Sequence, residues 1–569
     1  MQEPIIEFEN FTFKYKHQAK PTLNGINLTI YKGEKVLIVG PSGSGKSTLG
    51  QCLNGLIPFS YEGDITGSLK IKGTETRSLD LFSISKLVGT VLQDSDSQFL
   101  GLTVAEDIAF SLENQCVPKR ELLEKVRQAA RLVEMEDKLE ASVHALSGGQ
   151  KQRTALGGVM VDDVEILLFD EPLAALDPHT GKYAIELIDQ IQKETDTTVI
   201  IIEHRLEDVL HKSVDRIVVV NNGLIQADLK PDTLLASDLL ATHHIREPLY
   251  LKALKYAGSN IEAHLLPSHL DTMDLTDAKA SIQKWLATPV PKGTEQNHPE
   301  ILKITNLDFT YPNGVKALND INVTIKKGEM ISIVGKNGAG KSTFAQILGG
   351  LNKDYVGILA YNGQDMRSQT ITQHASKIGL VMQNPNHMIS KHLIMDEVAL
   401  GLRHSALTDS EIQAKVENAL KVCGLFPFRN WPVSALSYGQ KKRVTIASIL
   451  VLEPEVLILD EPTAGQDLRS YTEIMEFLEQ LNQQGMTVIL ITHDMHLMLE
   501  YTTRALVFEG GELIADRRPE AVLSDKELSQ RAYLKETSLQ QLAHRLELDQ
   551  NEAFIRHFID YDKEVRKTW

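Results

Sequence analysis

Two glycine-rich segments of the chain have the composition of loops that bind phosphate. One runs from Gly40 to Thr48 and the other from Gly335 to Thr343, and both end in Gly-Lys-Ser-Thr. Glycine allows backbone N–H groups to approach phosphate oxygens closely. A short apolar run precedes each segment and a helical pattern follows it, so a helix N-terminus would add to the attraction for anions. The two segments therefore predict two sites for a nucleotide phosphate.

Each loop carries a lysine followed by a hydroxyl side chain. We predict that Lys46 and Lys341 reach the β- and γ-phosphates of ATP, and that Ser47 and Ser342 ligate Mg²⁺. The loop residues predicted to bind the nucleotide are Gly40, Pro41, Ser42, Gly43, Ser44, Gly45, Lys46, Ser47 and Thr48 in the first loop, and Gly335, Lys336, Asn337, Gly338, Ala339, Gly340, Lys341, Ser342 and Thr343 in the second.

Two acidic pairs follow apolar runs further along the chain. Leu167-Leu-Phe precedes Asp170-Glu171, and Leu457-Ile-Leu precedes Asp460-Glu461. A carboxylate at the end of a buried strand is well placed to hold Mg²⁺ through water, and we assign this role to Asp170 and Asp460. The next residues, Glu171 and Glu461, are the predicted general bases for the water that attacks the γ-phosphate.

These chemical groups recur in register along the chain. Lys46 and Lys341 are 295 positions apart, and Asp170 and Asp460 are 290 apart. A repeat of this length indicates a duplicated domain rather than a solenoid. The predicted domains are residues 1–228, an inter-cassette linker or small helical region at 229–300, a second copy at 301–520, and a C-terminal helical tail at 521–569.

Short apolar strands alternate with helical segments in each copy. This alternation predicts an α/β fold with a mostly parallel sheet. The opening of each copy, such as Ile26–Ile30, alternates between apolar and polar residues, so a small antiparallel β-subdomain is expected there.

A further motif precedes each acidic pair and resembles the signature of ABC ATPases. The residues that carry it are Ser147, Gly148, Gly149 and Gln150 in the first copy, and Ser437, Tyr438, Gly439 and Gln440 in the second, which is a variant. The resemblance covers both copies, about four-fifths of the chain. It implies two P-loop NTPase cassettes, each with a helical signature subdomain, whose signature residues help to bind ATP.

The resemblance also implies roles for residues matched one by one. Gln93 and Gln383 correspond to the glutamines that sense Mg²⁺ and the partner. His204 and His493 follow apolar strands as the catalytic switch histidine does. Tyr15 and Tyr311 correspond to the aromatic residues that stack on adenine, although a purely core role is the alternative.

In this family two cassettes face each other head to tail and sandwich each ATP. Since one chain carries both, the resemblance implies an internal pseudo-dimer in which Lys46 faces Ser437 and Lys341 faces Ser147. The first site would then use the irregular signature, in which Tyr438 replaces a glycine. We therefore expect both sites to hydrolyse ATP, with this one somewhat slower.

The bulk composition restricts the partners. The chain has 569 residues and a formal net charge of −17, which disfavours nucleic acid as a partner of the whole molecule. Three dispersed cysteines form no zinc or iron–sulfur pattern and fit a reducing compartment. Apolar runs are short, so any membrane span must come from another chain.

The segment from Gln93 to Phe110 resembles the corresponding segment of energy-coupling factor (ECF) ATPases, which drive vitamin and metal-ion import. The second copy, from Gln383 to Leu400, matches more loosely. The resemblance implies an ATPase at the cytoplasmic side of the cell membrane, peripheral to it. Its partners would be a transmembrane coupling protein and a substrate-binding membrane protein. The run Glu203–Glu207 resembles the ECF type associated with thiamine-precursor uptake.

Three alternatives remain open on sequence grounds. Soluble tandem cassettes that act on the ribosome have a similar length, but their linker is basic, whereas residues 224–300 here hold seven Lys/Arg and ten Asp/Glu. DNA-repair cassettes need zinc modules or long coiled coils. Tandem sugar-importer ATPases have a degraded second site, whereas the second phosphate loop here is intact.

Overall fold

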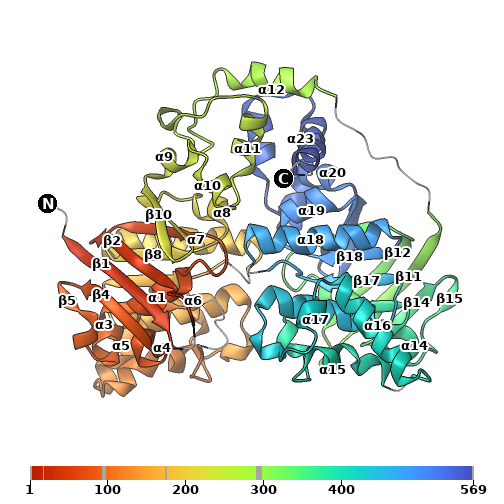
Figure 1. The fold of residues 1–569 in the computed structure, drawn as a ribbon, viewed down its shortest axis with the longest axis horizontal. Helices are drawn as coiled ribbons and strands as arrows, with labels where there is room; N and C mark the ends of the chain where they lie inside the picture. The colour runs from red at the N-terminus through yellow and green to blue at the C-terminus, as the bar shows by residue number, and fades with distance from the viewer. Residues whose placement is uncertain are drawn as a thin grey trace. The chain divides into compact units, whose positions relative to one another are not determined.

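The computed structural model describes residues 3–16, 18–92, 98–173, 176–289, 298–403, 405–464 and 466–566. The chain divides into two compact units (Figure 1). The first comprises Met1–Gln283 with Asp467–Arg469, and the second comprises Lys284–Gln466 with Ser470–Trp569. The first division lies inside the region that was predicted to join the two copies. Each unit is described by itself below.

The first unit opens with a four-stranded antiparallel sheet in the order β2-β1-β4-β5. Its strands are β1 (Pro4–Tyr15), β2 (Leu23–Tyr31), β4 (Gly63–Ile71) and β5 (Thr74–Glu75). Inward-facing side chains such as Phe8, Phe13 and Leu28 are buried, while their neighbours along the strands are exposed or half-buried. This alternation is typical of a sheet with one covered face, and it confirms the predicted antiparallel subdomain.

The main sheet of the first unit has six strands in the order β10-β9-β3-β8-β7-β6. The strands are β3 (Lys35–Val39), β6 (Val88–Val91), β7 (Ile166–Asp170), β8 (Thr198–Ile202), β9 (Arg216–Asn221) and β10 (Leu224–Leu229). Only β10 is antiparallel to its neighbour among these pairings. The strands β3 and β8 are buried along their whole length, as expected for parallel strands covered on both faces.

Helices connect these strands in the first unit. They are α1 (Lys46–Leu53), α2 (Leu56–Phe59), α3 (Leu81–Leu87), α4 (Val104–Asn114), α5 (Lys119–Leu132), α6 (Gly148–Met160), α7 (Pro178–Thr195) and α8 (Leu206–Val209), followed by α9 (Pro231–Leu235), α10 (Leu239–Thr242), α11 (Leu249–Tyr256) and α12 (Ala278–Leu286). Helices α4, α5 and α6 pack on one another and form the predicted helical subdomain that contains the signature.

The second unit repeats this plan. Its antiparallel sheet has the order β12-β11-β14-β15, and its main sheet the order β16-β17-β18-β13-β19-β20. The strands are β11 (Glu300–Thr310), β12 (Lys316–Lys326), β13 (Met330–Val334), β14 (Val356–Tyr361), β15 (Gln364–Asp365), β16 (Ile378–Val381), β17 (Val456–Asp460), β18 (Thr487–Ile491), β19 (Arg504–Glu509) and β20 (Glu512–Arg517). The predicted α/β fold is confirmed in both copies.

The helices of the second unit before the C-terminal tail have counterparts in the first unit, in which α2 is an addition. They are α13 (Lys341–Leu348), α14 (Ile371–Ala375), α15 (Ile394–Val398), α16 (Asp409–Val422), α17 (Tyr438–Leu450), α18 (Leu468–Gln483) and α19 (Met495–Tyr501), followed by α20 (Pro519–Ser524), α21 (Lys526–Arg531), α22 (Ser538–Arg545) and α23 (Asn551–Arg566). In the tail, α23 packs on α19, α20 and α22. No helix in the described ranges has the length and apolar character that a membrane crossing needs.

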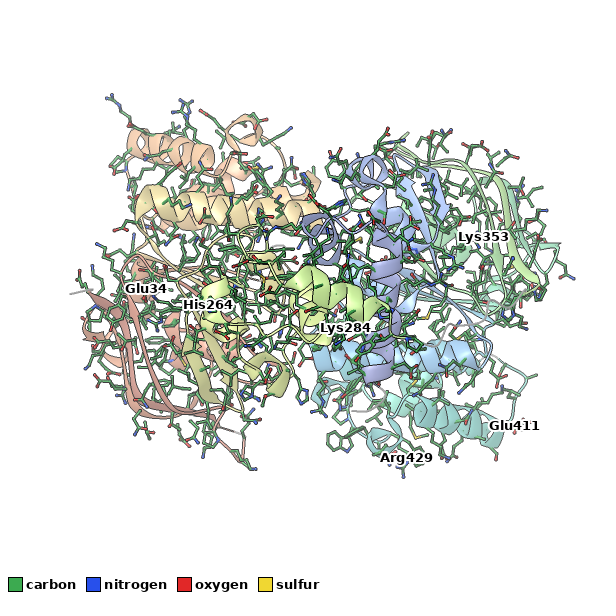
Figure 2. All side chains as sticks on the ribbon, turned by 90° about the horizontal axis from the view of Figure 1, so that it is seen from above. Glu34, His264, Lys284, Lys353, Glu411 and Arg429 are labelled. Atoms are coloured by element: carbon green, nitrogen blue, oxygen red, sulfur yellow. The ribbon has the colours of Figure 1, made fainter. Side chains whose placement is uncertain are left out.

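An ion-pair triad recurs at the edge of each main sheet and shows how closely the copies correspond. Arg216 lies 3.1 Å from Glu34 and 2.7 Å from Asp228; Figure 2 labels Glu34 in the first unit. In the second unit Arg504 lies 3.0 Å from Glu329, and it also pairs with the aspartate of β20. The triads join the turn before the central strand to two neighbouring strands.

Candidate nucleotide-binding sites

The first phosphate loop connects β3 to α1 and needs its glycines. A Cβ atom on Gly40 would lie 2.0 Å from the carbonyl oxygen of Val220, and Gly45 has a φ of 108°. Within this tight turn Lys46 Nζ donates to the carbonyls of Gly40 and Pro41 at 2.8 and 3.0 Å. Burial lowers the pKa of Lys46, and the nearby carboxylate of Glu171 opposes that shift.

The second loop repeats this geometry between β13 and α13. Lys341 Nζ donates to the carbonyls of Gly335 and Lys336 at 2.7 and 2.9 Å. A Cβ atom on Gly340 would lie 2.6 Å from the carbonyl oxygen of Ala317. Both loops therefore place a buried ammonium group and a helix N-terminus at the carboxyl end of a central strand, which is the arrangement that attracts phosphate.

Carboxylates suited to a divalent cation lie at the ends of β7 and β17. Burial, aided by Glu171, raises the pKa of Asp170 to about 6, and its buried Oδ1 accepts no hydrogen bond from the described residues. In the second unit Ser342 Oγ donates to Asp460 Oδ2 at 3.0 Å, and burial raises the pKa of Asp460. A desolvated carboxylate beside a serine hydroxyl fits Mg²⁺, which prefers hard oxygen ligands and keeps several waters.

The predicted general bases have a strained backbone. Glu171 and Glu461 have φ values of 50° and 47°, in the left-handed region that costs a non-glycine residue energy and often marks functional sites. Their N–H groups donate to the last carbonyls of β8 and β18, at 2.8 Å for Glu171 and 3.0 Å for Glu461. Each glutamate is thereby anchored directly beyond the last residue of its strand.

The structure brings each predicted switch histidine to its glutamate. His204 Nε2 lies 2.9 Å from Glu171 Oε1, within hydrogen-bonding distance. His493 Nε2 lies 3.7 Å from Glu461 Oε1. The two copies therefore assemble the same pair with different separations. An imidazole in this position can orient the carboxylate and share its proton.

Glu203, to which the sequence analysis assigned no role at the site, supports the first histidine. Its side chain is buried, and it accepts hydrogen bonds from the backbone N–H groups of His204 at 2.7 Å and Leu173 at 3.1 Å. Burial raises the pKa of this carboxyl. The second copy has Thr492 in the same position. A comparison of the two copies could have drawn attention to Glu203, because a carboxylate stands there in the first copy and a threonine in the second.

The predicted adenine-stacking residues lie beside the phosphate-loop helices. The hydroxyl group of Tyr15 lies 3.2 Å from Thr48 Oγ1, and that of Tyr311 lies 2.9 Å from Thr343 Oγ1. Both rings are half-buried, and each makes an edge contact with the phenylalanine two positions earlier in the chain. Their position next to the nucleotide loops is established, while stacking on adenine stays a prediction.

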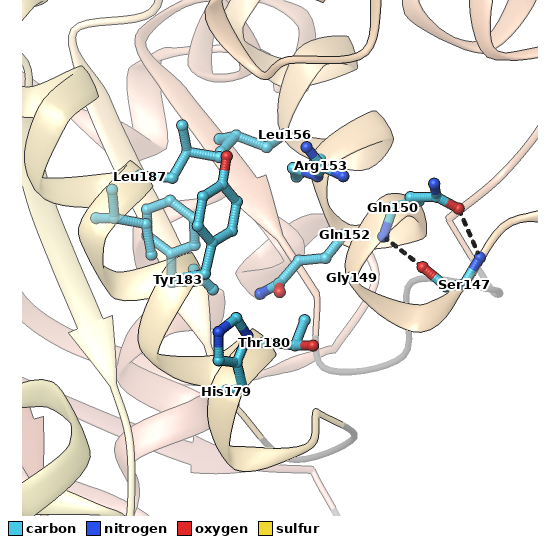
Figure 3. Close-up of a pocket in the computed structure, with 13 residues that line it drawn as sticks. Ser147, Gly149, Gln150, Gln152, Arg153, Leu156, His179, Thr180, Tyr183 and Leu187 are labelled. Atoms are coloured by element: carbon cyan, nitrogen blue, oxygen red, sulfur yellow. Dashed lines mark hydrogen bonds between the residues drawn. The ribbon is translucent and has the colours of Figure 1, made fainter. Parts of the chain in front are cut away.

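The two signatures form helix N-termini. Ser147 caps α6 in a capping box with Gln150, and Ser437 caps α17 in the same way with Gln440. Figure 3 shows the first box and the cavity of about 230 Å³ beside it, whose walls come mainly from α6 and α7. A Cβ atom on Gly149 would lie 2.4 Å from Thr180 Cγ2. The helix N-termini fit the predicted role in binding anionic phosphate.

The two glutamines that were predicted to sense Mg²⁺ and the partner follow strands β6 and β16. Gln93 lies outside the described residues. The main-chain carbonyl of Gln383 accepts a hydrogen bond from Lys442 Nζ at 2.5 Å. The sequence analysis missed Lys442, whose pKa burial lowers to about 8 against the opposing effect of Glu461 and Asp460.

Comparison with protein families finds three families that match parts of this chain. The family described as ABC transporter matches residues 23–174 and 318–464. The family described as ATP-binding cassette cobalt transporter matches residues 237–309, and an AAA domain family matches residues 429–500.

Whole-length relatives agree. A protein of Clostridium perfringens described as an ABC transporter ATP-binding protein is 55% identical over 99% of this chain and 100% of its own. One from Enterococcus faecalis is 55% identical over the full length of both chains, and one from Photobacterium profundum is 54% identical over 98% of this chain and 99% of its own.

Among solved structures, the cbiO1 protein of Clostridium perfringens, part of the ABC transporter complex cbiONQ, is 36% identical. It covers 44% of this chain and 99% of its own, with a TM-score of 0.39. The two family matches over the phosphate loops and acidic strands, together with the full-length relatives, decide the family. The chain belongs to the ABC transporter ATP-binding proteins and carries two ABC ATPase domains.

Proposed function

We propose that this chain energises an ECF-type importer of a vitamin or metal ion from the cytoplasmic side of the cell membrane. Two ATP sites, each with its own lysine, aspartate, glutamate and histidine, support ATP-driven work at both cassettes. The observation that carries the proposal is that this paired catalytic geometry occurs together with exposed apolar side chains next to the glutamine segments, where a membrane partner would dock.

These apolar side chains come from the helical subdomains. Leu100 and Leu102 are 66% and 71% exposed just before α4, and Phe110 on α4 is 40% exposed. In the second unit Met382 and Leu393, which flank the segment after Gln383, are 37% and 38% exposed. Exposed apolar groups gathered on one segment favour an interface with another protein. We propose that a transmembrane coupling protein binds here and that a separate membrane protein binds the cargo.

The residues of each site divide the reaction between them. Lys46 and Lys341 would exchange their loop carbonyl contacts for phosphate oxygens when ATP binds. The serine and aspartate of each site would hold Mg²⁺, which would supply positive charge against the phosphates. Glu171 and Glu461 would accept a proton from the attacking water while the neighbouring histidine orients the carboxylate. The products are ADP and phosphate, and their release would reopen the cassettes.

Two resemblances bear on the identity of the transported cargo. The family that matches residues 237–309 is described as a cobalt transporter family, which favours a divalent metal ion. The run Glu203–Glu207 resembles ATPases of thiamine-precursor uptake. Transport of radiolabelled cobalt and of a labelled thiamine precursor into cells that carry or lack this chain would separate the two cargoes.

Site-specific cross-linking tests the docking surface. Leu102→Cys, introduced after replacement of the exposed Cys116, should cross-link to a membrane-spanning protein in native membranes. Leu224→Cys serves as the matched control because Leu224 is also an exposed apolar residue, 41% accessible, but lies on β10 of the main sheet. Capture of ribosomal proteins instead, or equal cross-linking at both positions, would contradict the proposal and favour a soluble tandem ATPase.

A further inference from the structure

Two side chains of the second signature helix converge on one backbone oxygen. Lys442 Nζ donates to the carbonyl of Gln383 at 2.5 Å, and the hydroxyl group of Tyr438 donates to the same carbonyl at 3.3 Å. The two residues are four positions apart on α17, so they share a face of the helix. The glutamine segment is thereby held to the start of the signature helix.

Lys442 also reaches the catalytic end of β17. Its Nζ lies 3.3 Å from the carbonyl oxygen of Glu461 and 3.3 Å from that of Met382. The side chain is 1% exposed, and a buried ammonium group needs such acceptors because desolvation is costly. One buried cation therefore joins α17, the glutamine segment and the backbone of the predicted general base.

The first cassette has a different arrangement at the matching positions. Gly148 stands where the second has Tyr438, and Gln152 stands where the second has Lys442. Gln152 Nε2 donates to the carbonyl of Pro172 at 2.8 Å, a neutral hydrogen bond to the residue after the glutamate. Charged hydrogen bonds are about twice as strong as neutral ones.

We propose that Lys442 is a positioning residue for ATP hydrolysis in the second cassette. It fixes the backbone of Glu461 and Gln383 relative to the signature helix, so that the glutamate and the partner-sensing segment move together. The inference deepens the proposed function and rests on the assignment of Glu461 as the general base. Tyr438, which replaces the usual glycine of the signature, would help Lys442 to hold the glutamine segment to α17.

The experiment isolates the second site by measuring single-turnover hydrolysis in a Glu171→Gln background. Lys442→Gln introduces the residue that the first cassette has at this position, and Lys442→Met keeps an unbranched side chain, one atom shorter, without any donor. Both should lower the hydrolysis rate at least about tenfold, because a small displacement of a catalytic group is costly. The dissociation constant for ATP should stay within about twofold, since the described hydrogen bonds of Lys442 all go to backbone carbonyls outside the phosphate loops.

The matched control is Gln152→Met in a Glu461→Gln background, which removes one neutral hydrogen bond from the first cassette. Its hydrolysis rate should change less than about threefold. A rate for Lys442→Gln and Lys442→Met within twofold of the parent would overturn the proposal. Loss of ATP affinity and thermal stability in step with the rate would also overturn it, because that pattern indicates a purely structural lysine.

A further arm separates this inference from the proposed catalytic assignment. Glu461→Gln is combined with Glu171→Gln in the same assay. If this double variant retains hydrolysis, the assignment of Glu461 itself is wrong, and the role of Lys442 falls with it. If the double variant is inactive while Lys442→Gln is fully active, only the role of Lys442 is wrong.

Discussion

Replacement of the phosphate-loop lysines should remove one ATP site at a time. Lys46 and Lys341 are buried, and each donates two hydrogen bonds to loop carbonyls that phosphate oxygens must replace. A hydrogen bond to a charged group contributes about 1.5–3 kcal/mol, so two contacts to phosphate would contribute about 3–6 kcal/mol. Loss of the two carbonyl contacts offsets part of this, at about 1.5 kcal/mol each.

The net loss is therefore up to about 3 kcal/mol, which corresponds to binding up to about 150-fold weaker at the altered site. Calorimetric titration with ATP under conditions that prevent hydrolysis should give two sites in the wild type. Lys46→Ala and Lys341→Ala should each leave one site of unchanged affinity. Lys86→Ala is the control, since Lys86 on α3 lies outside both phosphate loops and forms a loose ion pair with Asp162 at 3.4 Å. A wild-type stoichiometry of one would refute the reasoning.

Three further predictions concern parts of the chain outside the phosphate loops. Cys116 is exposed, whereas burial raises the pKa of Cys423 to about 12, so mass spectrometry after brief alkylation of the native protein should find label on Cys116 and none on Cys423. Burial lowers the pKa of His374 in the folded protein. The neutral imidazole therefore adds to the free energy of unfolding above the unfolded-state pKa of about 6.5, and this contribution is lost as the pH falls through the lower folded-state pKa. The free energy of unfolding should therefore fall more steeply between pH 7 and pH 5 in the wild type than in His374→Ile, and equal slopes would contradict this. Arg566 lies 2.6 Å from the buried Asp562 of α23, so Arg566→Met should cost about 3 kcal/mol in denaturant unfolding, and a cost below about 1 kcal/mol would show that the pair is not important.

Features that depend on local chemistry could be predicted from the sequence. The glycine pattern at Gly40–Thr48 imposes a tight turn wherever it lies between a strand and a helix, and the structure has it between β3 and α1. The run ending in Asp170 is four apolar residues followed by a carboxylate, which predicts a buried strand with a carboxylate at its end, and the structure has this in β7. The same reasoning predicted the antiparallel subdomain from alternating residues.

Contacts with backbone atoms of distant segments could not be predicted in this way. Lys442 bonds to the carbonyl of Gln383, 59 positions earlier in the chain, and any residue at that position would offer the same acceptor. The comparison of the two copies shows the change from Gln152 to Lys442, but only the fold shows what the lysine reaches. The separations of 2.9 and 3.7 Å between histidine and glutamate likewise depend on the packing around each strand end.

The C-terminal tail is a second region in which the sequence predicts the helices but not their packing. Its apolar spacing predicted helices, and α22 and α23 are present. Where α23 packs on α19, Arg566 makes a buried contact with Glu500 at 3.4 Å. A charge near the end of a chain is usually solvated, so nothing in its sequence context indicates that this one is buried.

The central claim is that both cassettes hydrolyse ATP, and single-turnover hydrolysis in Glu171→Gln and Glu461→Gln tests it most directly. Loss of a general base typically lowers a rate by about 10²–10⁴-fold. With the membrane partner present, each variant should retain one active site and lose the other, with ATP trapped at the altered site. If Glu171→Gln hydrolyses ATP at the wild-type rate while Glu461→Gln abolishes hydrolysis, the first site only binds the nucleotide and the claim of two working sites is wrong.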